Sequence, residues 1–342
     1  MAHKRPVLWF LVVMAVLAMT GAGIAQPAKP APLGSFRVDL AKTSVSGLSA
    51  GGFMATQFHV ANSASVIGVG VVAGGAYLCA AENPLLAAAC MQANGFWPQA
   101  QALYEQAVPL AGLGRIDPLE GVKSARVYLF SGRNDMIVST AAVDAVQDFY
   151  RAAKVPANQI RYEKGIEAGH GFIAPGGPND CNANRPPYVN ACGTYDQAGQ
   201  ILSHVYGGLN PPVSEPRAAV PFDQTPFLGA DGSDRSGLAD TGYVHVPPAC
   251  AGGAACAVHV VFHGCRQSAA SVGDAVTTAA GYNQWAANNN LIVLYPQMAE
   301  GRPGNPLGCW DWRGTTGQDY ATRSGAQIAA INAMLKTLAG QR

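Results

Sequence analysis

Short apolar runs alternate with longer amphipathic stretches along most of the chain. Five of the runs are hydrophobic enough to be buried on both faces, as strands of a parallel sheet are: Val66–Val72, Arg126–Phe130, Ile160–Ile166, His259–His263 and Leu291–Tyr295. The amphipathic stretches predict helices at Ala141–Ala153, Asp196–Tyr206, Ala275–Asn288 and Ala326–Ala339. Strands that alternate with helices indicate an α/β protein with a doubly wound, mostly parallel sheet.

Two segments interrupt this alternation. Pro211–Pro226 is rich in proline, and we expect it to connect two halves of one domain. Ala76–Asp117 is a long, partly helical insertion that is placed where it could cover a cleft. The pattern therefore predicts a single domain over residues 35–342.

The first residues have the pattern of an export signal. A basic start at residues 3–5 precedes the apolar run Val7–Met19, and small residues flank position 24. This predicts a signal peptide over residues 1–25, followed by a Pro/Ala linker at 26–34. The alternative is a membrane anchor, for which the apolar run is short. We expect a secreted protein, periplasmic or extracellular, that is not membrane-bound after cleavage.

The composition limits the partners of the chain. Of its 342 residues 49% are hydrophobic and 13% are charged, and the formal net charge is +1. These values suit a well-packed globular core and argue against binding to nucleic acid or to an anionic membrane.

The eight cysteines fit export, because an even number in an exported chain favours disulfides. Proximity in sequence suggests the pairs Cys79–Cys90, Cys181–Cys192 and Cys250–Cys256, which leaves Cys265 with Cys309. The sequence alone leaves this connectivity open. The alternative of a zinc site lacks CxxC spacing and neighbouring histidines, so we expect no metal.

A Gly-x-Ser-x-Gly pentapeptide spans Gly47–Gly51, between the strand-like stretch Phe36–Val45 and a predicted helix at Phe53–Val60. This strand–turn–helix context exposes the central serine above a sheet, at a helix N-terminus that favours developing negative charge. We therefore predict Ser49 as a nucleophile, with the backbone N–H of Ala50 donating to an oxyanion. The alternative is a glycine-rich turn without catalytic meaning in a chain that holds 40 glycines.

A serine nucleophile needs a histidine base that is oriented by an acid. Asp135 follows the predicted strand Arg126–Phe130 after a glycine turn, where the acid of this chain order is expected. The competing aspartates are Asp117, Asp144 and Asp148. His170 lies between two glycines after the next predicted strand, whereas the other histidines lie in predicted helices or strands or in other motifs. We predict Asp135 as the acid and His170 as the base.

An HG turn at His263-Gly264 follows a predicted strand late in the chain, although such a turn normally precedes the nucleophile and supplies half of the oxyanion hole. Joining Arg342 to the region near Phe36 would restore the usual order, which predicts a circular permutation. The alternative is two unrelated domains, neither of which would hold both a triad and an oxyanion hole.

Five strings together carry a specific resemblance: GLSAGGFMA at Gly47–Ala55, SGRND at Ser131–Asp135, AGHGF at Ala168–Phe172, VVFHGCRQS at Val260–Ser268 and GCWDWRG at Gly308–Gly314. In content and order they resemble the polyhydroxybutyrate (PHB) depolymerase family, in particular its single-domain, circularly permuted extracellular members. The resemblance spans most of the chain that follows the signal segment.

The resemblance implies an α/β-hydrolase fold in which the Ser49–His170–Asp135 triad works with an oxyanion hole made by the amides of Ala50 and Cys265. It implies that a Cys265–Cys309 disulfide ties the oxyanion turn to the tryptophan loop. Trp310 and Trp312 would then border the cleft, and of the two we prefer Trp310 as the cleft residue. The alternative for each tryptophan is ordinary packing in the core.

The expected function is that of a secreted serine carboxylester hydrolase, which cleaves poly(3-hydroxybutyrate)-type polyesters or their oligomers through an acyl-enzyme. Such chemistry needs no metal or organic cofactor. One alternative is a feruloyl, acetylxylan or general short-chain esterase. A second is an inactive binding protein with a hydrolase fold. The sequence leaves the oligomeric state open.

Overall fold

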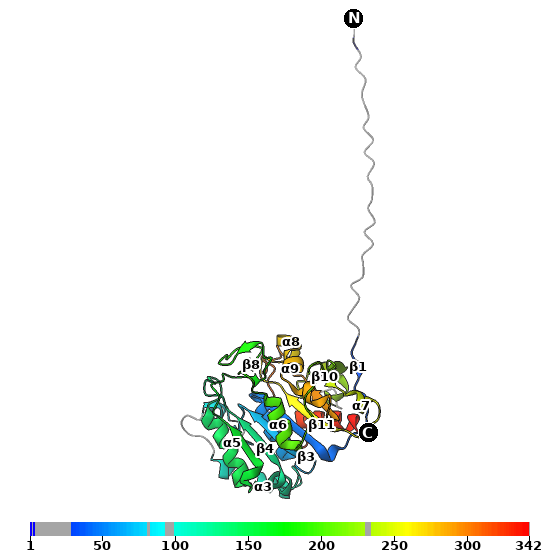
Figure 1. Cartoon of the computed structure of the whole chain (residues 1–342). Helices are drawn as coiled ribbons and strands as arrows, with labels where there is room; N and C mark the ends of the chain where they lie inside the picture. The colour runs from blue at the N-terminus through cyan, green and yellow to red at the C-terminus, as the bar shows by residue number, and fades with distance from the viewer. Residues whose placement is uncertain (2, 4–28, 81–82, 93–98, 230–233, 342) are drawn as a thin grey trace.

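The computed structural model describes residues 1, 3, 29–80, 83–92, 99–229 and 234–341, which form a central sheet between two layers of helices (Figure 1). The sheet has nine strands in the order β1-β9-β10-β12-β11-β2-β3-β4-β5. In that order their bounds are Ala31–Pro32, Val220–Asp223, Thr241–His245, Leu291–Tyr295, Ala257–Phe262, Thr43–Leu48, Val66–Val72, Arg126–Phe130 and Ile160–Glu163. The six strands from β12 to β5 are parallel, and β10 runs antiparallel to both of its neighbours.

The apolar runs of the sequence form the central strands of the sheet. Strands β3, β4 and β12 have the predicted bounds, and β5 ends three residues before its predicted end. The bounds expected for the strand before the pentapeptide were wrong. Leu40–Lys42 form a 3₁₀ helix, and β2 runs over Thr43–Leu48, because its buried residues begin only at Thr43.

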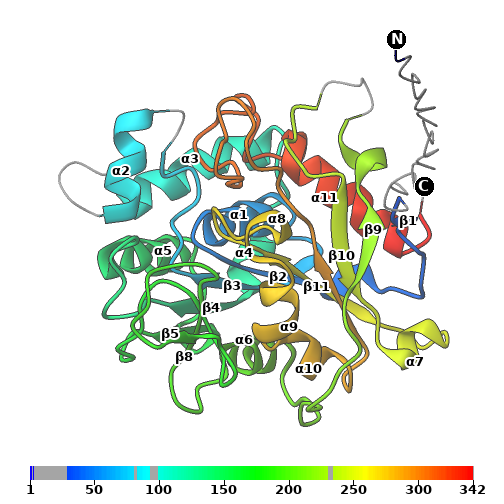
Figure 2. The same cartoon turned by 90° about the horizontal axis from the view of Figure 1, so that it is seen from above.

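One face of the sheet is covered by α1 (Ala50–Ala61), α3 (Ala100–Gly112), α5 (Thr140–Ala152) and α11 (Ala326–Leu338), and the other by α6 (Gln197–Tyr206), α9 (Ala275–Ala279) and α10 (Tyr282–Ala286), as Figure 2 shows. The remaining helices are α2 (Pro84–Gln92), α4 (Glu120–Ser124), α7 (Pro248–Ala251) and α8 (Ala269–Val272). The single helix predicted over Ala275–Asn288 was wrong. Gly281 has a φ of 90°, which ends one helix and begins another beside α6.

The first described segment belongs to the sheet and is not a free linker. Ala31 and Pro32 pair with β9, Lys29 forms an ion pair with Asp223 at 2.8 Å, and Leu33 is buried. A proline can join an edge strand because it needs no partner for a backbone N–H there. The linker predicted at 26–34 is therefore wrong from Lys29 onward, whereas the signal peptide predicted at 1–25 lies almost wholly outside the described residues.

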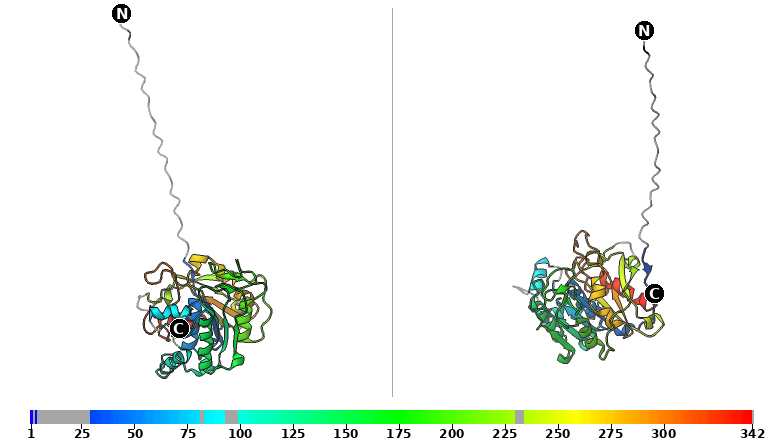
Figure 3. Two further views of the ribbon diagram at one scale, coloured as in Figure 1. Left: turned by 90° about the vertical axis from the view of Figure 1, so that its left-hand side faces the viewer. Right: turned by 45° about the horizontal axis from the view of Figure 1, so that its top comes forward.

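The two ends of the described chain meet beside the sheet. The N–H of Phe36 donates to the carbonyl of Leu338 at 2.7 Å, and the C-terminus lies near β1 (Figures 1 and 3). β2, from the start of the chain, pairs between β3 and β11, and β11 comes from its last third. This arrangement is the circular permutation that the order of motifs predicts.

Four disulfides cross-link the described chain, with the pairing that the sequence suggests: Cys79–Cys90, Cys181–Cys192, Cys250–Cys256 and Cys265–Cys309. The second joins the residues that directly follow β7 (Asn179–Asp180) and β8 (Val189–Ala191), which form a small parallel sheet with β6 (Phe172–Ile173). None of the helices described is long and apolar enough to cross a bilayer.

Burial lowers the pKa of four histidines around the sheet, His59, His245, His259 and His263, and favours their neutral form. Burial lowers the pKa of His59 and His259 to about 3 and that of His263 to about 4. In an unfolded chain each would titrate near its usual pKa of about 6.5. Below that pH the unfolded chain takes up protons that the fold excludes, so stability is full above about pH 6.5 and falls as the pH falls.

We predict that the free energy of unfolding falls by at least about 4 kcal/mol between pH 7 and pH 5.5. His59, His259 and His263 each exclude a proton at a cost of about 1.4 kcal/mol per pH unit, and His245 adds to the loss. Denaturant unfolding with the disulfides intact measures this. In His59→Gln the loss should shrink by about 1 kcal/mol. A stability that stays level over this range, or a His59→Gln slope equal to the wild-type slope, would contradict the prediction.

Candidate active site

Ser49 occupies a strained turn between β2 and α1. Its φ is 58° and its ψ is −124°, and its N–H donates to the carbonyl of Val72 at 3.0 Å. A Cβ at Gly47 would come within 2.1 Å of the carbonyl oxygen of Gly51, and a Cβ at Gly51 would come within 2.2 Å of that of Phe262. The two glycines of the pentapeptide are thus required by backbone packing. They allow a turn that carries Ser49 to the carboxyl end of the sheet.

His170 and Asp135 form a buried pair. The Nδ1 atom of His170 lies 2.8 Å from Oδ2 of Asp135, and the two side chains are 4% and 1% exposed. The other carboxylate oxygen, Oδ1, accepts the N–H groups of Ile137 at 2.8 Å and Val138 at 2.9 Å. The carboxylate therefore has a fixed orientation, and it can hold Nδ1 as the protonated nitrogen, which leaves Nε2 free to act as a base.

A residue that the sequence did not single out joins the two loops that carry this pair. The Oδ1 atom of Asn184 accepts the N–H of His170 and the N–H of Met136, both at 3.0 Å. Its Nδ2 atom donates to the carbonyls of Asn134 and Asn182 at 3.0 and 3.1 Å. Asn184 lies inside the Cys181–Cys192 loop, where no motif or periodicity marks it.

The HG turn lies against the serine turn. A Cβ at Gly264 would lie 3.4 Å from the Cβ of Ser49. The side chain of Gln267 accepts the N–H of Gly264 at 2.7 Å and donates to the carbonyl of Tyr188 at 3.1 Å. The Cys265–Cys309 disulfide ties the turn to the loop that carries the tryptophans. The turn is therefore held on several sides next to Ser49, as an oxyanion hole requires.

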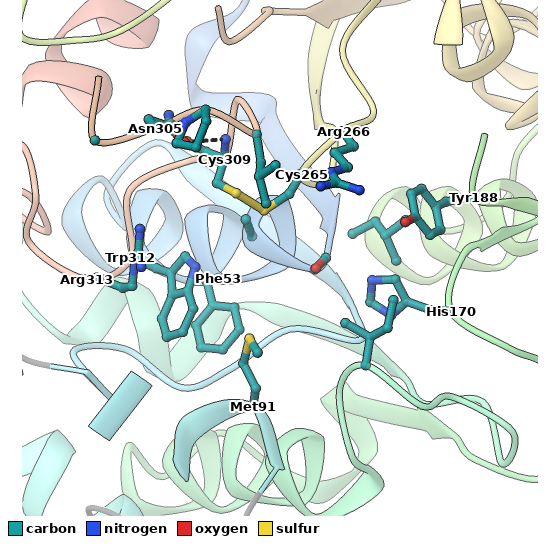
Figure 4. A pocket seen from close by; sticks show the side chains of 18 residues that line it. Phe53, Met91, His170, Tyr188, Cys265, Arg266, Asn305, Cys309, Trp312 and Arg313 are labelled. Atoms are coloured by element: carbon teal, nitrogen blue, oxygen red, sulfur yellow. Dashed lines mark hydrogen bonds between the residues drawn. A yellow bond between two sulfur atoms is a disulfide. The ribbon is translucent and has the colours of Figure 1, made fainter. Parts of the chain in front are cut away.

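A cavity of about 540 Å³ brings these residues together (Figure 4). Ser49, Ala50, His170 and Cys265 line it, together with an apolar wall made by Phe53, Met91, Ile137, Leu307 and Trp312. Met91 belongs to α2, so the insertion predicted at Ala76–Asp117 does border a cleft. The only charged side chains among the described lining residues, apart from any charge on His170, are Arg266 and Arg313.

The two tryptophans lie in different places. Trp312 lines the cavity and stacks on Phe53 with ring centroids 4.2 Å apart. Trp310 is 1% exposed, packs edge-on against Phe262 at 4.9 Å, and does not line this cavity. The preference for Trp310 over Trp312 as a cleft residue was therefore wrong, because Trp310 packs against Phe262 in the core whereas Trp312 stacks on Phe53 at the cavity.

A second serine–histidine contact lies in the core. Both ring nitrogens of His259 bond to hydroxyls, Nδ1 to Ser44 at 2.6 Å and Nε2 to Ser46 at 2.8 Å. All three residues have no exposed surface, and none of them lines the cavity. Since no substrate can reach these three side chains, their hydrogen bonds link β2 and β11 and have a structural role.

The chain resembles known proteins in sequence and in structure. No protein-family model matches the chain. It is 38% identical over 330 residues to a poly(3-hydroxybutyrate) depolymerase of Delftia acidovorans, covering 94% of this chain and 64% of that protein. It is 34% identical over 340 residues to a polyhydroxybutyrate depolymerase of Talaromyces funiculosus, covering 94% of this chain and 96% of that protein.

Two solved structures resemble the whole domain. The crystal structure of PHB depolymerase from Penicillium funiculosum matches with a TM-score of 0.81 at 32% identity, covering 90% of this chain and 99% of that one. A PHB depolymerase variant in complex with an R3HB trimer matches with the same TM-score at 33% identity and the same coverage. The Talaromyces relative and both solved structures match over nearly their full length, and the doubly wound sheet carries a serine turn. The chain therefore belongs to the PHB depolymerase family of carboxylic ester hydrolases, which have an α/β-hydrolase fold.

Proposed function

We propose that this protein hydrolyses poly(3-hydroxybutyrate)-type polyesters or their oligomers, with Ser49 as nucleophile, His170 as base and Asp135 as its orienting acid. The observation that carries the proposal is that the His170–Asp135 pair and the strained Ser49 turn border one largely apolar cavity. An apolar cleft of this kind suits a polyester strand, whose repeating units are uncharged.

The reaction follows from the roles of these groups. His170 takes the proton of the Ser49 hydroxyl as its oxygen attacks the ester carbonyl, and the amides of Ala50 and Cys265 bind the oxyanion that forms. The C–O bond to the alcohol then breaks, and His170 gives the proton to the leaving oxygen. Water attacks the acyl-enzyme by the same route and releases the acid and the free serine.

The disulfides support export as part of the proposal. Four cross-links in one domain are typical of proteins from oxidising compartments. We propose that the protein acts outside the cytoplasm, where a polyester or its soluble oligomers are its substrate.

The substrate class is tested by offering four esters side by side. These are a poly(3-hydroxybutyrate) film, its soluble oligomers, a p-nitrophenyl butyrate and a feruloylated xylan fragment. We expect release of 3-hydroxybutyrate and its oligomers from the first two. Release of ferulate without any product from the oligomers would instead assign a plant-wall esterase. The absence of any hydrolysis and of fluorophosphonate labelling would assign a binding protein.

The nucleophile is tested by Ser49→Ala, which should lower kcat on p-nitrophenyl butyrate by about four to six orders of magnitude because the covalent route is lost. The matched control is Ser44→Ala, on the same strand and in the other serine–histidine contact. It should keep its activity while the free energy of unfolding falls by about 1–3 kcal/mol, since a buried His259 nitrogen loses its partner. Activity that survives in Ser49→Ala and disappears in Ser44→Ala would reverse the assignment.

Asn184 is tested as a positioning residue. In Asn184→Ala the backbones of His170 and Met136 lose their shared acceptor, and kcat should fall about ten- to a hundredfold with little change in KM. Asn184→Asp keeps the acceptor and should recover part of kcat. Asn182→Ala serves as the control, since only the backbone carbonyl of Asn182 takes part. If kcat falls in proportion to Tm in all three variants, and by the same proportion in each, then Asn184 has only a structural role.

Substitution of Trp312 should weaken substrate binding, whereas substitution of Trp310 should lower the stability of the fold. Trp312→Ala removes part of the cavity wall and should raise KM for a trimer about five- to tenfold, with a smaller effect on p-nitrophenyl acetate. Trp310→Ala leaves a hole in the core and should lower the free energy of unfolding by about 3–5 kcal/mol. Steady-state kinetics and denaturant unfolding measure the two effects, and equal KM changes in both variants would contradict this division.

A further inference from the structure

Strained backbone is concentrated around the cavity. Among the described residues, the non-glycine residues with positive φ are Ser49, Ala73, Leu78, Lys154, Tyr188, Arg266 and Asn290. Three of these seven, namely Ser49, Tyr188 and Arg266, line the active-site cavity. Such conformations are unfavourable for residues with a Cβ, and they persist where the surrounding structure imposes them, often at functional sites. Ser49 has its function in the proposed reaction, which leaves Tyr188 and Arg266 to be explained.

Arg266 is held in its strained conformation from both sides. Its φ is 54°, and its N–H donates to the carbonyl of Leu307 at 2.8 Å. Cys265 before it is fixed by the disulfide to Cys309, and Gln267 after it bonds to the carbonyls of Pro187 and Tyr188. The backbone is therefore rigid at this point, and it directs the arginine side chain to the cavity (Figure 4).

The guanidinium of Arg266 is available for an anion. In the part of the chain that the structure describes, no ion pair involves Arg266, and none of the residues that line the cavity is Asp or Glu. The residue is exposed at the cavity rim, so it keeps its charge without a desolvation cost. A planar guanidinium binds a carboxylate through two parallel hydrogen bonds.

The chemistry of the reaction says which end of the substrate lies near Arg266. His170 gives its proton to the leaving oxygen, so the leaving alcohol lies on the His170 side of Ser49. Tyr188 packs edge-on against His170 with ring centroids 5.8 Å apart, and the side chain of Gln267 reaches the backbone of Tyr188. The turn that carries Arg266 thus borders the leaving-group side.

A hydroxyacid polyester has a direction. The leaving alcohol is the hydroxyl of the next hydroxyacid unit, and the carboxyl group of that same unit lies beyond it. If the unit is the last in the chain, this carboxyl is a free carboxylate. It is the only permanent negative charge on such an oligoester, and it arises on the side of the cleft that Arg266 borders.

We propose that Arg266 binds the terminal carboxylate of the leaving hydroxyacid. The enzyme therefore prefers oligoesters with a free carboxyl end and removes one unit at a time from that end. This inference rests on the proposed function and adds to it the end of the chain that the site recognises.

The second cationic residue of the cavity provides a matched control. Arg313 lies beside Trp312, which stacks on Phe53, on the other side of the cavity from Tyr188 and His170 (Figure 4). This side holds Phe53 and Trp312 of the apolar wall, and we place the acyl part of the strand there. Arg313 has the same charge as Arg266 and is also exposed. Comparing variants of the two arginines therefore distinguishes a specific contact of Arg266 with the carboxylate from a general attraction of anions to the cavity.

The size of the effect is limited by solvent. A charge pair at an exposed rim is screened by water, so we expect a preference of about three- to tenfold in kcat/KM for the acid over its neutral ester. Salt shortens the reach of the attraction, to about 3 Å at 1 M ionic strength, and the preference should shrink there.

The experiment compares the (R)-3-hydroxybutyrate trimer as free acid with its methyl ester, for the wild-type chain, Arg266→Gln, Arg266→Lys and Arg313→Gln. The measured quantity is the ratio of kcat/KM for acid to that for methyl ester, at low and at high salt. We expect a wild-type ratio of about three to ten, a ratio near one in Arg266→Gln, partial recovery in Arg266→Lys and the wild-type ratio in Arg313→Gln. A tetramer with a chromophore on its hydroxyl end should release unlabelled monomer first.

The inference is overturned if the wild-type enzyme cleaves the methyl ester as well as the acid, if the ratio survives in Arg266→Gln, or if both arginine variants lower it equally. First release of labelled monomer would overturn it as well. These outcomes leave the proposed function intact, because the esters are still cleaved. If neither ester is cleaved, the proposed function fails and this inference falls with it.

Discussion

The turn between β2 and α1 has no room for a side chain at Gly47 or Gly51, two residues before and two residues after Ser49. Gly47 packs on the backbone of Gly51, and Gly51 packs on the backbone of β11 at Phe262. This close approach fixes where α1 begins and how β11 runs past it, and it places the HG turn that follows β11 beside Ser49. The proposed nucleophile and its oxyanion donors are therefore positioned by one constraint, which is contact between backbones.

The acid and the base depend on polar side chains and cross-links, because they lie on loops. Strands β4 and β5 bring the chain only to the carboxyl edge of the sheet, and Asp135 and His170 follow several residues later. Asn184 supplies hydrogen bonds that regular structure would otherwise supply, and the Cys181–Cys192 disulfide closes the loop that carries it. Gln267 and the Cys265–Cys309 disulfide do the same for the oxyanion turn. Loops fixed in this way can keep a catalytic geometry without reorganisation during the reaction.

The circular permutation changes the order of the chain and leaves these contacts in place. β2 lies between strands from both ends of the domain, and the N–H of Phe36 bonds to the carbonyl of Leu338, so the first and last segments are neighbours. A domain whose ends already touch can be opened elsewhere with little cost to its packing. What the site requires is that β11, β2 and β3 are adjacent in the sheet, and hydrogen bonds between strands ensure this whatever their order in the chain.

The sequence by itself determined the features that depend on neighbouring residues. Continuous apolar runs gave β3, β4 and β12 their bounds, and the glycine pattern located the turn at Ser49. Short separations indicated three of the disulfides. Asp135 and His170 could be proposed because each follows a strand in the expected chain order. A local window contains all of this information, since burial and backbone geometry are properties of a few consecutive residues.

Only the tertiary structure decided what depends on distant residues. Trp310 and Trp312 are two positions apart with the same local pattern, yet packing against Phe262 buries one and stacking on Phe53 places the other in the cleft. Asn184 carries no signal, because its partners lie 14 and 48 residues away. The segment at 31–34 reads as a linker until β9 gives it a partner. Such contacts form when the chain is folded, and no pattern of single residues encodes which distant groups will meet.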